Sequence, residues 1–256
     1  MNQPQSQPLK RFLALDTSTA CLALAVMEND TVLHTIQAAG ERNHSVHLLP
    51  LIQKGLAEAG LASSEVDGIA VGIGPGSYTG TRIAVTAAKT LAWAWRIPVV
   101  GISSLHAFGW SGLLSAMDSC EGENWVIPMI DARRGQAYTA LFQANGKSMP
   151  VRAKEDAIRL MDAWVDELDR LLQETPEERQ PDHVWFVGDN GNHDEVVERL
   201  RPLLGSRLHM ISGDMAGEPV GRLGSDRLMR GEEDDAHRLV PNYTQLAEAE
   251  KLLRKP

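Results

Sequence analysis

Cysteine is scarce in this sequence, which has only two in 256 residues. Neither Cys21 nor Cys120 belongs to a CxxC pair, so the spacing of a zinc or dithiol site is missing, and Cys21 is expected to be a buried free thiol. No run approaches the roughly 18 apolar residues that a membrane helix needs. The Gln/Pro-rich start, 1–10, has no apolar core of a secretory signal, which indicates a frayed tail. We therefore expect a cytoplasmic protein without membrane contact.

Basic residues are in deficit as well. Lys and Arg number 25 against 34 Asp and Glu, which gives a formal net charge of −9. Without clustered cations, the chain alone is not expected to bind a nucleic-acid backbone strongly. Aromatic residues make up 5%, and no basic residues interleave with the tryptophans. Base-stacking platforms are therefore disfavoured, and any nucleic-acid substrate would be held mainly by another protein.

Glycine, by contrast, is concentrated in the stretch GIGPGSYTG at 72–80. It follows an apolar run at 66–73 and precedes an Ala-rich segment at 79–96, so it is expected to turn a strand into a helix. A P-loop would need Lys-Ser/Thr after Gly80, where Thr81 and Arg82 stand instead. A dinucleotide fingerprint would need glycine at Thr79. The pattern predicts a tight turn and leaves a ligand contact open.

The order of expected elements defines the fold class. The first half contains strands at 12–15, 21–27 and 31–37, a helix at 44–59, a strand at 66–73, a helix at 79–96 and a strand at 98–101. The second half partly repeats this order, with strands at 125–130, 136–143 and 146–151, a helix at 154–174, a strand at 183–188, a helix at 194–203, a strand at 207–211 and a helix at about 214–230. This predicts a two-lobed α/β fold of the actin/hexokinase/Hsp70 type. We expect 11–103 plus about 214–245 in the N-terminal lobe and about 104–213 in the second.

The two helices of the first lobe have more apolar surface than a single buried stripe requires. Within 44–59 the apolar positions recur at helical spacing, and Val46 and Leu49 widen that stripe. The segment 79–96 is rich in alanine, which permits close helix approach. The helices could pair only with each other over a sheet, or they could also present a face to a partner.

Two polar turns are candidate cleft residues. Asp16, Thr17 and Ser18 occupy the first hairpin turn, where nucleotide-binding members of this fold class hold phosphate, but no glycine accompanies them. Asp131 and Arg133 follow a strand and are expected to point into the cleft, either binding an anion or fixing a turn. Histidines 44 and 47 lack a third ligand, so no metal site is predicted.

Several motifs resemble the TsaB (YeaZ-type) family of bacterial tRNA threonylcarbamoyladenosine synthesis. They occur in family order and are LDTST at 15–19, NHS at 43–45, LLP at 48–50, GPGSYTGTRIA at 74–84, DARRGQAY at 131–138 and, more loosely, VPNY at 240–243. The resemblance implies a non-catalytic subunit that heterodimerises with TsaD, which transfers the threonylcarbamoyl group to N6 of adenosine 37. The ATPase TsaE joins them, tRNA is bound only through the complex, and a homodimer is possible when the chain is alone.

The resemblance also implies which residues matter. Family partner contacts are expected among Leu48, Leu51, Ile52, Leu56, Tyr78, Thr79, Arg82, Ile83 and Ala87. Aligning the strand at 98–101 with TsaD puts TsaD's two metal-binding histidines at Ser104 and Phe108, with His106 between them. The chain is thus expected to hold no metal and no cofactor by itself, with ATP or ADP only in the assembled complex. The alternatives are an ATP-dependent phosphotransferase and a stand-alone homodimeric binding module.

Overall fold

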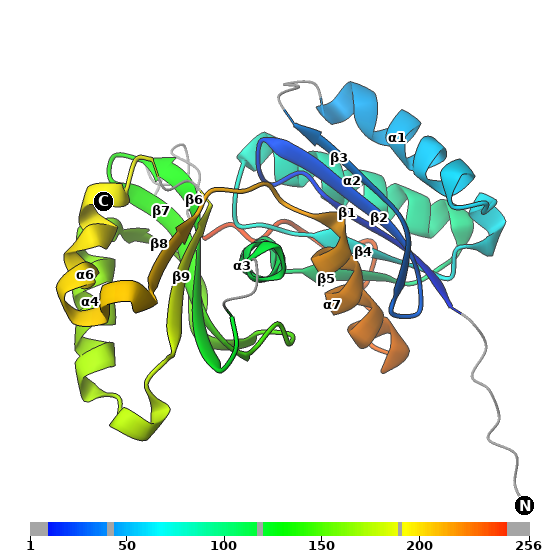
Figure 1. Cartoon of the computed structure of the whole chain (residues 1–256). Helices are drawn as coiled ribbons and strands as arrows, with labels where there is room; N and C mark the ends of the chain where they lie inside the picture. The colour runs from blue at the N-terminus through cyan, green and yellow to red at the C-terminus, as the bar shows by residue number, and fades with distance from the viewer. Residues whose placement is uncertain (1–9, 40–43, 117–119, 189–190, 245–256) are drawn as a thin grey trace, which may run out of the picture.

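The protein is built around two five-stranded mixed sheets (Figure 1). The computed structural model describes residues 10–39, 44–116, 120–188 and 191–244. The tail expected at 1–10 lies outside these residues, apart from Lys10. The first sheet has the order β3-β2-β1-β4-β5, with β1 (Arg11–Asp16), β2 (Cys21–Glu28), β3 (Thr31–Ala39), β4 (Gly68–Gly72) and β5 (Val99–Ile102). The second has the order β10-β9-β6-β7-β8, with β6 (Glu123–Arg133), β7 (Gln136–Asn145), β8 (Val151–Leu160), β9 (His183–Gly188) and β10 (Leu208–Ile211).

The two sheets share one topology. In each, the first three strands form an antiparallel meander, and the last two strands add in parallel on the other side of the first strand. Parallel additions need crossover connections, which the helices supply. The predicted two-lobed, actin-like α/β fold is confirmed by this repeated order.

Helices cover the sheets in layers, as Figure 1 shows. The longer helices are α1 (His44–Glu58), α2 (Tyr78–Trp95), α3 (Ser104–Ser115), α4 (Met161–Glu174) and α7 (Gly217–Met229), and α5 (Asp194–Val197) and α6 (Arg201–Leu204) are single turns. Helices α1 and α2 share a core with one face of the first sheet. Helix α7 packs on the other face of that sheet, α3 lies between α7 and the second sheet, and α4 to α6 cover the second sheet's far face.

One predicted element of the second lobe is wrong. The segment 154–160 was expected to begin a helix, and the preceding strand was expected at 146–151. The structure instead has strand β8 at Val151–Leu160, paired antiparallel with β7, and α4 begins at Met161. The sequence RAKEDAIR is rich in helix-forming residues, but pairing with β7 overrides that preference. Its charged side chains suit an edge strand.

A second correction concerns the helix expected at 194–203. The structure breaks it into α5, a 3₁₀ turn at Glu198–Leu200 and α6. Pro202, in the first turn of α6, has no N–H to donate to the carbonyl of Glu198, so a continuous α-helical hydrogen-bond pattern is interrupted there. The helix expected at about 214–230 begins three residues later, at Gly217.

Candidate functional site

The first hairpin turn is sealed inside the first lobe. Asp16, Thr17 and Ser18 are fully buried. The Asp16 carboxylate accepts hydrogen bonds from the Ser18 amide (2.6 Å) and the Ser104 hydroxyl (2.6 Å). Burial raises the pKa of Asp16, and these hydrogen bonds oppose the rise. A carboxylate so enclosed stabilises the turn and is not exposed to a ligand.

The glycine-rich segment fills the space that a ligand would need at this turn. The Thr17 hydroxyl donates to the Gly80 carbonyl (2.6 Å), and the Ser77 amide donates to the Ser18 carbonyl (2.7 Å). A Cβ on Gly80 would lie 1.9 Å from the Thr17 carbonyl oxygen, and one on Gly76 would lie 2.5 Å from that of Ser18. The glycines therefore permit backbone-to-backbone packing.

The second turn, between β6 and β7, is built differently. The Arg133 amide donates to the Asp131 carboxylate (3.2 Å), and Nε2 of buried His193 lies 3.3 Å from Oδ1 of Asp131. Arg133 itself is exposed. The sequence left open whether Asp131 and Arg133 bind an anion or fix a turn. In the structure the two side chains have different surroundings. Asp131 supports the turn together with His193, a residue that sequence reasoning missed. Arg133 faces solvent.

Helices α1 and α2 flank an apolar groove of about 580 Å³. The residues that line it are Ser45, Leu48, Leu49, Tyr78, Thr79, Arg82, Ile83, Thr86, Ala87, Thr90 and Leu91. Leu49 and Tyr78 are 52% and 50% exposed. An exposed patch with this composition is typical of a protein-binding surface.

The expected partner residues divide by burial. Leu48, Ile52 and Leu56 are buried in the core beneath α1, so they support the groove from below. Leu51, Ile83 and Ala87 are half-buried, and Tyr78, Thr79 and Arg82 are exposed. Leu49 and Val46, which were noted only as widening the apolar stripe, are the large apolar residues of α1 that are exposed. In the sequence, the signal for this exposure was that both residues lie outside the single buried stripe of α1.

A stacked cluster closes one end of the groove. The Arg82 guanidinium lies 3.9 Å from the centre of the Tyr78 ring and donates to the Tyr243 hydroxyl (2.7 Å). The Asn242 amide donates to the Ile73 carbonyl (2.7 Å), which ties the segment at 241–243 to the end of β4. This cluster links the loosely matching VPNY motif to the start of α2.

The positions aligned with TsaD's metal-binding histidines hold groups with other roles. The Ser104 hydroxyl donates to Asp16, and Phe108 is buried in the central core. Among residues 10–39, 44–116, 120–188 and 191–244, no group of three or more His, Cys, Asp or Glu side chains could hold a metal. Nor, in the same ranges, is any helix long and apolar enough to cross a bilayer. Cys21 and Cys120 are both buried and free, as expected for Cys21.

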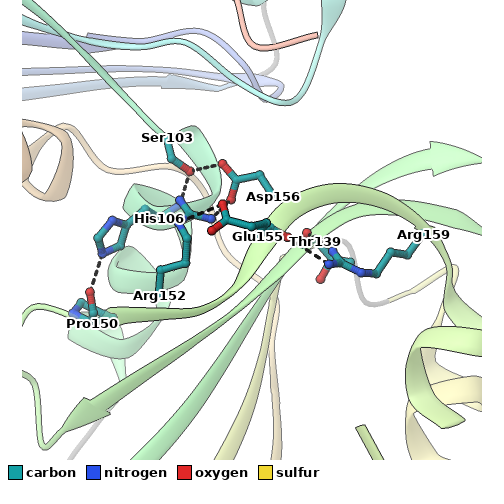
Figure 2. A network of polar contacts seen from close by, with 8 residues as sticks. All are labelled: Ser103, His106, Thr139, Pro150, Arg152, Glu155, Asp156 and Arg159. Carbon is teal, nitrogen blue, oxygen red and sulfur yellow. Dashed lines mark hydrogen bonds and ion pairs between the residues drawn. The ribbon is translucent and has the colours of Figure 1, made fainter. Parts of the chain in front are cut away.

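His106, between those two positions, contributes to a network that joins α3 to β8 (Figure 2). Ser103 donates to Asp156 (2.7 Å), which also pairs with Arg152. Nε2 of His106 lies 2.6 Å from the Pro150 carbonyl, so it carries the proton and donates. The His106 ring stacks on Phe142 with centroids 4.6 Å apart. The network therefore holds α3 against the second sheet, to which β8 belongs.

His106 should make stability depend on pH. Burial lowers the pKa of His106 from 6.5 to about 4. Between those values the unfolded chain takes up a proton and the folded chain does not, so stability falls as pH drops from about 6.5 to 4. At pH 4.5 the loss from this residue should be about 2–3 kcal/mol relative to pH 7. Other carboxylates also titrate, so the measurement is urea unfolding of wild type and His106→Gln at both pH values. An equal loss in both proteins would contradict the assignment.

This chain is similar in sequence to known proteins over most of its length. A family model described as "TsaD: tRNA N6-adenosine threonylcarbamoyltransferase" matches residues 32–193. The tRNA threonylcarbamoyladenosine biosynthesis protein TsaB of Bacillus subtilis is 34% identical over 240 residues, with 93% of this chain and 96% of the relative covered. The TsaB protein of Escherichia coli is 32% identical over 53% of this chain and 56% of its own length.

Solved structures agree on the fold. The structure of YeaZ from Pseudomonas aeruginosa superposes with a TM-score of 0.70 at 24% identity, covering 91% of this chain and 99% of that one. At that identity the likeness concerns the fold alone. The near-complete coverage extends over both sheets, including the second lobe, where the sequence motifs are sparse.

Proposed function

This chain belongs to the TsaB (YeaZ-type) family, and we propose that it is the non-catalytic partner of a TsaD-type transferase that makes threonylcarbamoyladenosine in tRNA. The relation to Bacillus subtilis TsaB, 34% identity over nearly the whole of both chains, supports the pathway. In this proposal TsaD transfers the threonylcarbamoyl group to adenosine 37, the ATPase TsaE joins the complex, and tRNA is bound through the complex. Such a role on tRNA is a cytoplasmic one.

One observation carries the non-catalytic role: the first hairpin turn is filled by the protein itself. Asp16, Thr17 and Ser18 have no exposed surface, and the glycine-rich segment is packed onto their backbone. A phosphotransferase of this fold would need that turn open to hold a phosphate. The turn's closure argues against ATP binding by this chain alone and against the phosphotransferase alternative. Any ATP or ADP would be bound by the assembled complex.

The positions related to TsaD's metal ligands support the same division of labour. Ser104 is committed to Asp16 and the Gly74 amide, and Phe108 offers no ligating atom. The chain therefore has TsaD's fold without the side chains for TsaD's metal. It is expected to assist a reaction whose reactive groups lie in the partner.

The apolar groove between α1 and α2 is the proposed partner surface. Leu49, Tyr78 and Ile83 line it, and the buried leucines of α1 hold it in shape. A stable heterodimer would bury roughly 1,200–2,000 Å² in total across this face. In the absence of TsaD, a second copy of the chain is the expected occupant, which accommodates the homodimer alternative.

The deciding experiment is reconstitution. The purified chain, TsaD from the same organism and their mixture are measured by light scattering, and each is assayed for transfer from threonylcarbamoyl-adenylate to tRNA in the presence of TsaE. We expect a heterodimer, tRNA modification only when TsaD is present, and no stoichiometric zinc or iron on the chain alone. Modification by the chain alone, or a metal equivalent that is lost on mutating His106, would contradict the non-catalytic role. A mixture that forms no heterodimer would contradict the partnership.

A further inference from the structure

The tip of the β6–β7 hairpin presents two adjacent arginines without a partner. Arg133 and Arg134 are exposed, and within the described residues neither guanidinium has a hydrogen bond, an ion pair or a ring contact. Most other arginines of the described chain are engaged, for example Arg11 with Glu28 and Arg227 with Glu232. In a chain of net charge −9, two neighbouring free guanidinium groups are a local exception.

The backbone holds these arginines in a costly conformation. Arg133 and Arg134 have φ values of 66° and 56°, and Gly135 follows at 70°. The left-handed region costs a residue with a side chain roughly 1–2 kcal/mol, and glycine or asparagine would relieve that cost. A register shift between Asp131 and Arg133 marks a bulge, and the Arg133 amide is fixed by the Asp131 carboxylate. Bulges of this kind re-aim side chains near functional sites.

The hairpin stands beside the proposed partner surface. Tyr138, three residues beyond Gly135, lines the same small cavity as Pro75 and Tyr78 at the start of α2. Three residues of extended strand span about 10 Å. A macromolecule bound across the chain and its partner at this end of α2 would therefore be within reach of both arginines.

We propose that Arg133 and Arg134 bind the phosphate backbone of the tRNA held by the complex, an inference that rests on the proposed function. Guanidinium groups bind phosphate oxygens with paired hydrogen bonds, and unpaired ones have no intramolecular ion pair to break first. The acidic remainder of the chain explains why this contact operates only beside a partner. A nucleotide phosphate is disfavoured, because the opposing turn at Asp16 is closed.

The test compares two double variants in the complex with TsaD. Arg133→Asn with Arg134→Asn removes both charges while asparagine tolerates the left-handed backbone. Arg170→Asn with Arg179→Asn removes two exposed arginines that also lack partners, on α4 and the turn after it. Binding of unmodified tRNA is measured by filter retention between 50 and 200 mM salt. We expect the hairpin variant to bind about tenfold more weakly and to lower the salt slope by about 1.5, whereas the control equals wild type.

Other outcomes overturn the proposal. Wild-type affinity and slope in the hairpin variant would exclude the phosphate contact. Loss of the heterodimer in light scattering would assign the arginines to the partner protein, and loss of ADP binding with unchanged tRNA binding would assign them to a nucleotide. The proposed function fails separately, if the wild-type complex does not modify tRNA. Melting temperatures of both variants, expected within a few degrees of wild type, check that the hairpin still folds.

Discussion

Replacing Gly80 by alanine is expected to lower the free energy of unfolding by about 3 kcal/mol or more. Gly80 is the third residue of α2, and in an exposed helix the same change would stabilise by up to about 1 kcal/mol. Here the new Cβ would lie 1.9 Å from the Thr17 carbonyl oxygen, so α2 or the first turn must move. Movement would also break the 2.6 Å hydrogen bond from the Thr17 hydroxyl to Gly80.

Gly213→Ala is the matched control, because a Cβ there would meet no atom within 4 Å. It is expected to change stability by less than about 0.5 kcal/mol. Urea unfolding of both variants and wild type measures the difference. Equal stability of the two variants would mean that the turn and α2 are not in close contact. The closure of the first turn would then no longer argue against a nucleotide.

Local patterns were sufficient for most of the fold. The apolar runs at 12–15 and 21–27 are completely buried strands, and the apolar spacing in 44–59 forms α1. The segment 154–160, one of the two elements predicted wrongly, shows the limit of such patterns. That segment is polar and helix-favouring, and only its neighbour β7 makes it a strand. Local propensity does not include the hydrogen bonds that a neighbouring strand offers, so it cannot predict this strand.

The candidate site was harder to read than the fold. Asp16, Thr17 and Ser18 were located in the correct turn, but polar residues in a turn are normally exposed, and their burial depends on a loop sixty residues later. The orientation of the α1 side chains was similarly open. Leu48 and Leu49 are adjacent and chemically identical, yet 2% and 52% exposed. Helical spacing reveals a stripe, whereas packing against β2 and β3 decides which edge of it is covered.

Leu49→Glu is expected to weaken binding to TsaD at least a hundredfold while leaving the chain folded. In the free chain the new carboxylate would be solvated, because Leu49 is half-exposed. In a complex across the groove it would be buried without a partner, which costs about 3 kcal/mol or more in addition to the lost leucine contacts. Association is measured by titration with TsaD, and melting temperature is measured in parallel.

Two controls separate surface from core. Leu48→Glu, one residue away, puts the charge into the core beneath α1 and is expected to unfold the chain. Val151→Glu changes an apolar residue that is 70% exposed on β8, away from the groove, and should affect neither stability nor binding. The groove is the partner surface if Leu49→Glu, Ile83→Glu and Ala87→Glu each lose TsaD binding while the chain stays folded, and Val151→Glu keeps it. If all three bind TsaD like wild type, α1 and α2 only cover the sheet, and the partner binds elsewhere.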